Sequence, residues 1–241
     1  PHHPPTPPTP PPPPPHSSSA ASDVNKTQQW YTVENRSKTY VDKIIDKISG
    51  EHFKNYNVNK VVRNDFGAKI YYGGENEFFD YDKVVIATHA DQALDIIDNP
   101  TSDEEEILKN FKYRDNSAVI HFDESIMPKN KKAWCSWNSS MSKDNIKKTS
   151  VTYWLNQLQN LKINRDIFLT INPFRDIPED KIFKKVKFTH PYYDNAALSN
   201  QNNLNKIQNK KNILFCGSYF GYGFHEDGIK SSIDMLKTLN D

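Results

Sequence analysis

The feature that most constrains the fold is a strand, glycine-rich loop and helix in the C-terminal part of the chain. Residues 212–216 form a short apolar run, and three of the eight glycines lie between positions 217 and 223. Residues 228–239 then show an amphipathic helical pattern, with an apolar face made by Ile229, Ile233, Leu236 and Leu239. A second apolar run, residues 83–88, has the character of a strand that is buried on both faces of a parallel sheet. These segments predict a mixed α/β fold.

The strand–loop–helix unit has the properties of a ligand site. Glycines let the backbone approach a ligand closely. The N-terminus of a helix offers unpaired N–H groups to an electron-rich oxygen or a phosphate. The pattern alone agrees equally well with an ordinary connection in which Asp227 caps the helix.

The other elements follow from periodicity and turn signals. Helices are predicted at residues 37–48, 90–97 and 196–208, and Ser102 with Glu105 fits a capping box that opens another helix. Strands are predicted at 57–63 and 68–72, closed by a Gly73–Gly74 turn, with a further short piece from Phe78. The middle of the chain predicts a mostly antiparallel sheet of five strands, at residues 117–122, 133–137, 151–155, 167–171 and 182–188.

Composition excludes several classes of protein. Lys and Arg number 31 against 30 Asp and Glu, so nothing indicates a nucleic acid or an anionic membrane as partner. Cys135 and Cys216 lie in apolar stretches and are expected to be buried free thiols, not a disulfide or zinc site. No apolar run approaches the ~20 residues of a transmembrane segment, and no signal peptide is visible, so we expect a cytoplasmic protein.

The first 23 residues differ from the rest. Eleven of the 16 prolines lie in the first 15 positions, which predicts a disordered, partly polyproline II head at residues 1–23. Residues 4–7 fit the PxxP pattern of SH3 or WW ligands, an alternative that we favour less.

A resemblance to a known family favours a ligand site over a plain connection. Residues 223–228 read GFHEDG, and the tail resembles the C-terminal FAD motif of flavin-containing amine oxidoreductases. It is most similar to a bacterial group of predicted NAD/FAD-binding proteins that end in this signature. Other blocks of that group occur in the same order, at residues 30–41, 85–93, 120–123, 127–128, 133–138, 152–159, 172–173 and 190–191. The resemblance covers residues 28–241.

The chain also departs from the family. Its members open with a strand and a GxGxxG motif that holds the FAD pyrophosphate, and no such motif is present here. The resemblance therefore implies an FAD-dependent amine oxidase-like fold without its N-terminal Rossmann βαβ unit, and weak FAD binding by this chain. Family glycines are replaced by Asn35, Arg36, Asn209 and Ser232. Asn tolerates positive φ well, whereas Arg and Ser do so less readily.

The resemblance also implies that separate parts of the chain bind the cofactor and the substrate. Residues 24–241 would form a partial oxidoreductase domain, with residues 30–98 and 195–241 as the cofactor half and residues 99–194 as the β-rich substrate half. The reaction would be hydride transfer from a C–N or C–C bond of a small-molecule or lipid-like substrate to FAD. The alternative is a non-catalytic remnant that acts as an interaction or inert module, as the missing GxGxxG motif suggests.

The cofactor-binding residues are likewise implied by the resemblance. Backbone groups of Gly217 and Ser218 would face the pyrophosphate or ribitol, and the N–H groups of Gly228 and Ile229 would face the flavin. Val58 would contact adenine, and Ala87 and Thr88 would lie nearby. No catalytic residue is assigned.

Other polar and aromatic residues in the middle of the chain are given structural roles. His121 and Asp123 share a strand face but lack further ligands for a metal, so a hydrogen-bonding role is expected. Trp134, Trp137, Tyr153 and Trp154 are expected to be mostly core, with one or two lining a substrate cavity.

Overall fold

The computed structural model describes residues 31–74, 76–142 and 148–239. The predicted proline-rich head, residues 1–23, lies outside the described residues, as does the start of the first family block at Trp30.

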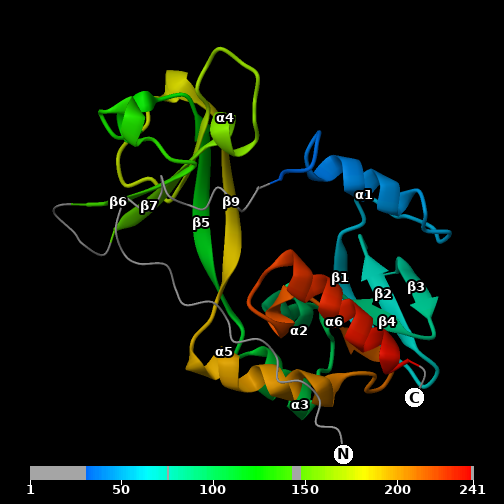
Figure 1. Ribbon diagram of the computed structural model, residues 1–241. Coiled ribbons are helices and arrows are strands. Elements are labelled where there is room, and N and C mark those ends of the chain that lie inside the picture. The colour runs from blue at the N-terminus through cyan, green and yellow to red at the C-terminus, as the bar shows by residue number, and fades with distance from the viewer. Residues whose placement is uncertain (1–30, 75, 143–147, 240–241) are drawn as a thin grey trace, which may run out of the picture.

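Three short strands form an antiparallel meander, as predicted. These are β1 (Val58–Arg63), β2 (Ala68–Tyr72) and β3 (Phe78–Tyr81), in the order β1–β2–β3. Gly73, in the turn after β2, has a φ of 66°, a conformation that favours glycine. The meander lies beside the pair of parallel strands described next (Figure 1).

The two apolar runs form a parallel pair, β4 (Val84–Ile86) and β10 (Ile213–Phe215). A hydrogen bond from Lys83 Nζ to Asn209 Oδ1, between residues 126 positions apart, joins the segments that precede the two strands. All three β10 residues are buried, and Val84 and Ile86 are 5% and 3% exposed. Val85 is 43% exposed, so the prediction that this strand is buried on both faces is wrong. The reason is that the apolar core of the described chain covers only one face of β4.

Helices α2 (Ala90–Ile96), α3 (Ser102–Leu108) and α5 (Asn195–Asn200) pack around this core, and a 3-10 stretch, Gln201–Ile207, continues α5. The capping box of α3 lies one residue earlier than predicted. Thr101 is the N-cap, and the carboxylate of Glu104 accepts a bond from its N–H at 2.8 Å. The buried Glu104 also pairs with Arg63 and thereby ties α3 to β1.

The middle of the chain folds into the predicted antiparallel sheet, in the order β6–β7–β8–β5–β9. Its strands are β5 (Lys112–His121), β6 (Trp137–Met141), β7 (Thr149–Trp154), β8 (Phe168–Ile171) and β9 (Ile182–Tyr192), with the one-turn helix α4 (Leu155–Leu158) after β7. The strand predicted at 133–137 was misplaced, because a 3-10 turn, Lys131–Ala133, precedes β6. The long strands β5 and β9 run from this sheet toward the parallel pair (Figure 1).

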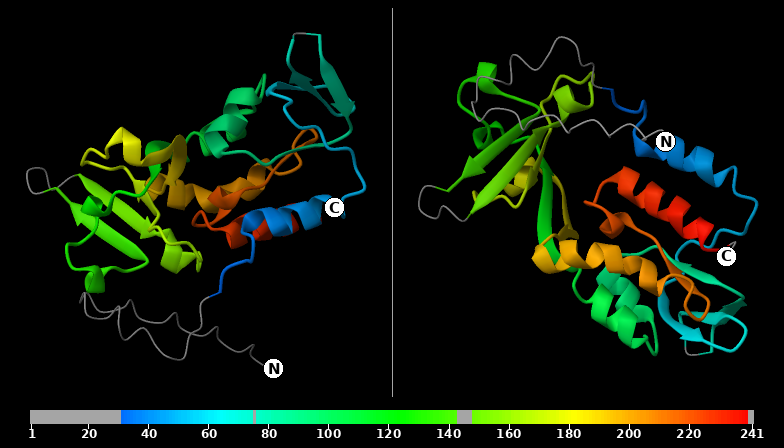
Figure 2. Two further views of the ribbon diagram at one scale, coloured as in Figure 1. Left: turned by 90° about the horizontal axis from the view of Figure 1, so that it is seen from above. Right: turned by 60° about the horizontal axis from the view of Figure 1, so that its bottom comes forward.

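Helices α1 (Ser37–Ile45) and α6 (His225–Lys237) expose their apolar faces. Ile229, Ile233 and Leu236 of α6 are 58%, 53% and 53% exposed, whereas the buried residues of this helix are Ser231 and Met235. The expectation that the periodic apolar residues of α6 form its core face is therefore wrong for the described chain. The two helices lie side by side, with α1 at the edge of the molecule (Figure 2). None of the helices in the described ranges has the length and apolarity needed to cross a bilayer.

The remaining structural expectations have mixed outcomes. Both cysteines are free, but only Cys216 is buried, because Cys135 lies in a loop and is half-buried. The hydrogen-bonding role of His121 is confirmed: it lies 2.8 Å from the hydroxyl of Thr170 and accepts a bond from the N–H of Asp123. Of the four aromatic residues expected to be mostly core, Trp134 is buried, while Trp137 is 60% exposed.

Candidate functional site

The glycine-rich loop meets the end of β4 where the two parallel strands finish. Cys216 N–H donates to the carbonyl of Ile86 at 3.2 Å, which aligns the two exits. A Cβ on Gly217 would lie 2.7 Å from the Tyr219 ring and 3.5 Å from the carbonyl oxygen of Thr88. The Tyr219 ring leaves room only for glycine there, and the predicted residues Gly217 and Thr88 lie next to each other. Carboxyl ends of parallel strands are a common ligand position.

Gly228 lies against the same loop. Ser231 Oγ accepts from Gly217 N–H at 2.9 Å and donates to the carbonyl of Gly228 at 2.7 Å, so one buried hydroxyl joins loop and helix. A Cβ on Gly228 would lie 3.9 Å from Ser218 N. Within the described ranges the Ser218 N–H has no hydrogen-bond partner, which leaves it available to an anion.

The predicted start of the last helix needs correction. Helix α6 begins at His225, three residues before Gly228, and Gly228 N–H donates to the carbonyl of Phe224 at 3.3 Å. Ile229 is the fifth residue of α6, so its N–H also lies beyond the first turn. The unpaired N–H groups at a helix N-terminus are those of its first turn, so the premise that these two N–H groups are free is wrong. Their assignment to a cofactor stays a prediction.

Asp227 organises the loop that precedes α6. Its carboxylate accepts from the N–H groups of Tyr222 and Phe224, both at 2.9 Å. A Cβ on Gly221 would lie 2.2 Å from this carboxylate, so glycine is required there too. The capping role considered for Asp227 is confirmed, and it holds the loop rigid next to the unpaired Ser218 N–H.

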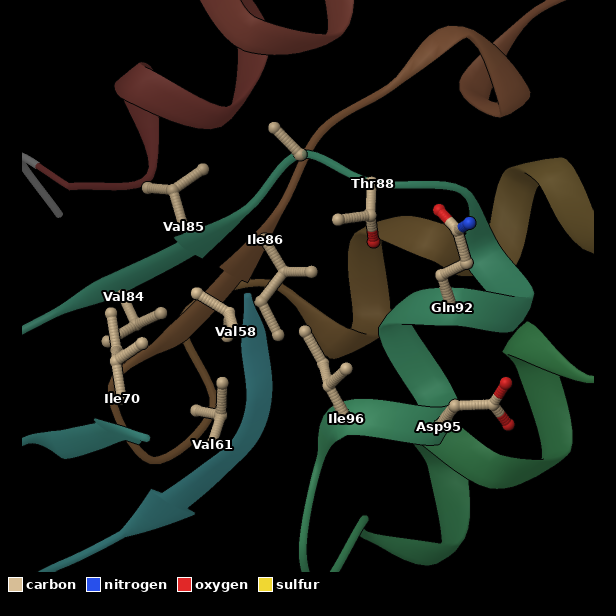
Figure 3. Close-up of a pocket in the computed structure, with 11 residues that line it drawn as sticks. Val58, Val61, Ile70, Val84, Val85, Ile86, Thr88, Gln92, Asp95 and Ile96 are labelled. Carbon is tan, nitrogen blue, oxygen red and sulfur yellow. The ribbon is translucent and has the colours of Figure 1, made fainter. Parts of the chain in front are cut away.

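A cavity of about 480 Å³ opens beside the free edge of β4. Its floor is apolar and comes from β1, β2, β4 and α2, with Val61, Ile70, Ile86 and Ile96 as main contributors (Figure 3). Three of the predicted residues line it, namely Val58, Ala87 and Thr88. Its volume lies in the range of small-molecule sites. No Lys, Arg or His is among its lining residues.

The polar end of this cavity contains residues that the sequence analysis missed. Gln92 and Asp95 line the cavity from α2, and the polar ends of Thr88 and Gln92 lie where β4 leads into α2 (Figure 3). Ser231 was missed as well, although its neighbour Ser232 was noted. The i, i+4 spacing of Gln92 and Ile96 could have indicated a common helix face toward the strand.

Tyrosine side chains occupy the junction between the parallel pair and the long strands. The ring of Tyr113 stacks on His89 with centroids 4.2 Å apart, and its hydroxyl accepts from Ala90 N–H at 3.0 Å. Burial raises the pKa of Tyr113 to about 12. Burial and the nearby Asp227 also raise the pKa of Tyr193, whose hydroxyl donates to the Ser218 carbonyl at 3.4 Å. Both phenols stay protonated at neutral pH and act as hydrogen-bonding groups.

One face of the five-stranded sheet presents an apolar surface, here called the apolar platform. Paired residues of an antiparallel sheet share a face, and two rows cross the strands: Trp137, Tyr153, Leu169 and Ile120, then Val151, Ile171, Ala118 and Val186. Trp137 is 60% exposed. The opposite face holds the buried polar residues Thr152, Thr170 and His121. In the described parts of the chain, no group of three or more His, Cys, Asp or Glu could hold a metal ion.

Comparison with known proteins identifies the fold. No protein-family model matches the chain, and no curated protein matches its sequence. Solved structures do match, all at low identity. A conjugated linoleic acid (CLA)-producing fatty acid isomerase from P. acnes superposes with a TM-score of 0.59 at 12% identity, over 84% of this chain and 51% of that one. A putative protoporphyrinogen oxidase from Exiguobacterium sp. 255-15 gives 0.58 at 10% identity, over 90% and 54%.

A putrescine oxidase bound to putrescine matches with a TM-score of 0.56 at 10% identity, over 86% of this chain and 53% of that one. The chain therefore has the mixed α/β flavin amine oxidase fold and spans about half the length of the structures it matches. The fold class implied by the sequence is confirmed.

Proposed function

We propose that the chain forms the cofactor- and substrate-contacting part of an FAD-dependent oxidoreductase. The observation that carries this proposal is the convergence of two segments far apart in sequence. Val58, Ala87 and Thr88 line one cavity, and the carbonyl oxygen of Thr88 lies 3.5 Å from where a Cβ on Gly217 would be. An elongated dinucleotide needs such an arrangement: a cavity for its nucleoside end and a glycine-rich loop for its pyrophosphate.

The residues fit FAD in three respects. The largely apolar cavity, which no Lys, Arg or His lines, suits adenosine. The unpaired Ser218 N–H suits a pyrophosphate oxygen, and Gly228 leaves the space in front of that N–H open. Bound FAD would supply a hydride acceptor for the oxidation of a C–N or C–C bond. The work of this chain would be to bind and orient both ends of the cofactor, with Asp227 and Ser231 holding the loop in place.

The substrate would be a small or lipid-like molecule with an apolar portion. The apolar platform supports this class, because its two rows offer large apolar side chains with partial exposure. The solved structures with this fold include a fatty acid isomerase and a putrescine oxidase, so the fold by itself does not choose between a lipid and an amine.

The test is a titration of the purified chain with FAD, followed by the change in flavin fluorescence, with ADP as competitor. We expect weak, saturable binding that ADP displaces. Val58→Trp should weaken binding at least tenfold, because the indole would occupy the cavity rim. Val186→Trp is the matched control, since both valines are 38% exposed on strands, and it should bind as the parent does. No saturable binding at millimolar FAD, or equal binding by both variants, would refute the proposed site.

A further inference from the structure

Aromatic side chains gather on and beside the meander, at the surface of the molecule. This aromatic cluster consists of Phe53, Tyr56, Tyr72, Phe79 and Tyr81. Tyr72 and Phe79 stack with ring centroids 4.8 Å apart. The Phe53 ring lies 4.7 Å from that of Phe79, and the Tyr56 ring lies 4.6 Å from that of Tyr72. Phe53, Tyr56 and Tyr81 are 42%, 43% and 43% exposed, and contiguous exposed rings of this kind mark an interaction site.

The aromatic cluster prolongs the face of the meander that packs on the apolar core. Ile70, which packs against that core, pairs with Phe79 across β2 and β3. Tyr72 lies two residues farther along β2 and therefore on the same face. Val61 and Ala68 are buried on this face, whereas the aromatic rings extend beyond the core. The described residues leave these rings partly open, so a ligand can pack on them.

A proline-rich segment has the chemistry that such a surface binds. Residues 4–15 contain ten prolines and two threonines, so they present pyrrolidine rings and carbonyl acceptors but few backbone N–H groups. Polyproline II ligands bind aromatic surfaces because the helix is formed in advance and loses little entropy. The hydroxyls of Tyr56 and Tyr81 have no hydrogen-bond partner among the described residues, so they are free to donate to carbonyl groups.

The chain is long enough to bring its proline-rich residues to the aromatic cluster. Residues 16–30 join them to Tyr31, the first described residue, and such a segment extends over as much as about 50 Å. Helix α1, which lies between Tyr31 and Phe53 in the sequence, is only about 14 Å long. The tether gives an effective concentration of about 1 mM, so a dissociation constant of about 0.3 mM keeps about three-quarters of the molecules docked.

We propose that residues 4–15 dock on the aromatic cluster of their own chain. The proline rings pack on the exposed aromatic rings, and the carbonyl groups accept from the tyrosine hydroxyls. A docked segment shields Tyr56 and Tyr81 from reagents in solution, whereas a free segment leaves both rings open. No cofactor takes part in this contact, so the proposal stands independently of the proposed function.

Nitration of tyrosine by tetranitromethane in the full chain, mapped by mass spectrometry, measures the shielding. The comparison is a serine variant, in which serine replaces the ten prolines of residues 4–15 and the chain length is kept. Tyr56 and Tyr81 should react about fourfold more slowly in the parent chain than in the serine variant, as the docked fraction requires. Tyr222 is the internal control, because it is 67% exposed outside the cluster, and it should react equally in both.

A synthetic peptide of residues 1–15 tests the same contact without the tether. Added to the serine variant, it should restore the shielding of Tyr56 and Tyr81, whereas a peptide with serine in place of proline should not. Phe53→Ser in the serine variant should weaken binding of the peptide about fivefold or more, because it removes an aromatic anchor. Phe183→Ser is the matched control, since Phe183 is an exposed phenylalanine of β9 outside the cluster, and it should bind the peptide unchanged.

Equal nitration of Tyr56 and Tyr81 in the parent chain and the serine variant would overturn the proposal and leave the proposed function intact. Shielding that persists in the serine variant and grows with chain concentration would also overturn it, because a second copy would then cover the aromatic cluster. Equal weakening of the peptide by Phe53→Ser and Phe183→Ser would place the contact elsewhere and overturn it as well.

Discussion

Arg36 holds a backbone conformation that residues with a Cβ rarely adopt. Its φ and ψ are 67° and −165°, in a region that is essentially restricted to glycine. The neighbouring Asn35 also has a positive φ, of 57°. The strained backbone therefore lies in the loop that leads into α1.

We predict that Arg36→Gly raises the free energy of unfolding by about 1 kcal/mol. The relief of strain outweighs the greater freedom of glycine in the unfolded chain and the loss of an exposed hydrogen bond from Arg36 to Gln159. Chemical denaturation measures the difference. Arg36→Ala loses the same hydrogen bond but keeps a Cβ, so it should show no gain; equal gains in both variants would show that strain is not the cause.

His121 should make stability depend on pH. Burial lowers the pKa of His121 to about 4 despite the nearby Asp123. Protonation at Nδ1 would also break the hydrogen bond that it accepts from the N–H of Asp123. In the unfolded chain the same group has a pKa near 6.5. As pH falls from about 6.5 to 4, the unfolded state binds a proton that the folded state does not bind. The free energy of unfolding therefore falls by roughly 3 kcal/mol.

Denaturation midpoints at pH 7 and pH 5 measure this dependence. His121→Asn removes the titrating group, and its stability should change less between these two pH values than that of the parent chain. An identical pH dependence in parent and variant would assign the effect to other groups. The buried Asp123 does not interfere, since hydrogen bonds from Lys181 and Ser125 outweigh its burial and hold its pKa below its usual range.

A substitution of Gly228 distinguishes a role in cofactor binding from a purely structural role in α6. Val at this position should change the free energy of unfolding by less than about 0.5 kcal/mol, because Gly228 lies inside α6 and a Cβ there meets nothing closer than 3.9 Å. The branched side chain would, however, cover the unpaired Ser218 N–H. We predict that Gly228→Val loses FAD binding and keeps its circular dichroism spectrum. Unchanged FAD affinity would remove this helix from the proposed site.

Among the elements, α6 shows best what periodicity can and cannot predict. The pattern located the helix and its apolar face, but it could not say whether anything covers that face. The start of α6 was also missed: the sequence suggested Asp227 as the cap of a helix from residue 228, whereas Asp227 lies inside α6 and accepts from the N–H of the N-cap residue Phe224. By contrast, the strands β5, β7, β8 and β9 were predictable, since alternating apolar residues and polar loops delimit them.

The exposed face of α6 leads to a paired prediction. Ile233→Ser should cost less than about 1 kcal/mol, because Ile233 is 53% exposed, and should reduce self-association of the chain by removing apolar surface. Met235→Ala should cost about 2–4 kcal/mol, because Met235 is 5% exposed. Thermal unfolding and light scattering on both variants check this. A larger loss for Ile233→Ser would mean that the apolar face is covered in solution.

In the molecule as a whole, the sequence predicted the segments of the candidate site better than its side chains. The resemblance pointed to residues 85–88 and 217–228, and the parallel pairing of β4 with β10 brings them together. Gln92 and Ser231 escaped notice because their roles depend on hydrogen bonds to backbone groups of other residues, His89 and Gly217. Such bonds are set by tertiary packing and leave no periodic pattern in the sequence.

The central claim is that one dinucleotide spans the cavity beside β4 and the loop before α6. Amide hydrogen exchange of the chain, with and without saturating FAD, tests it most directly. The account predicts slower exchange in two separate segments, residues 84–92 and residues 214–228, with little change on the apolar platform. Protection of only one segment, or protection confined to the five-stranded sheet, would contradict it.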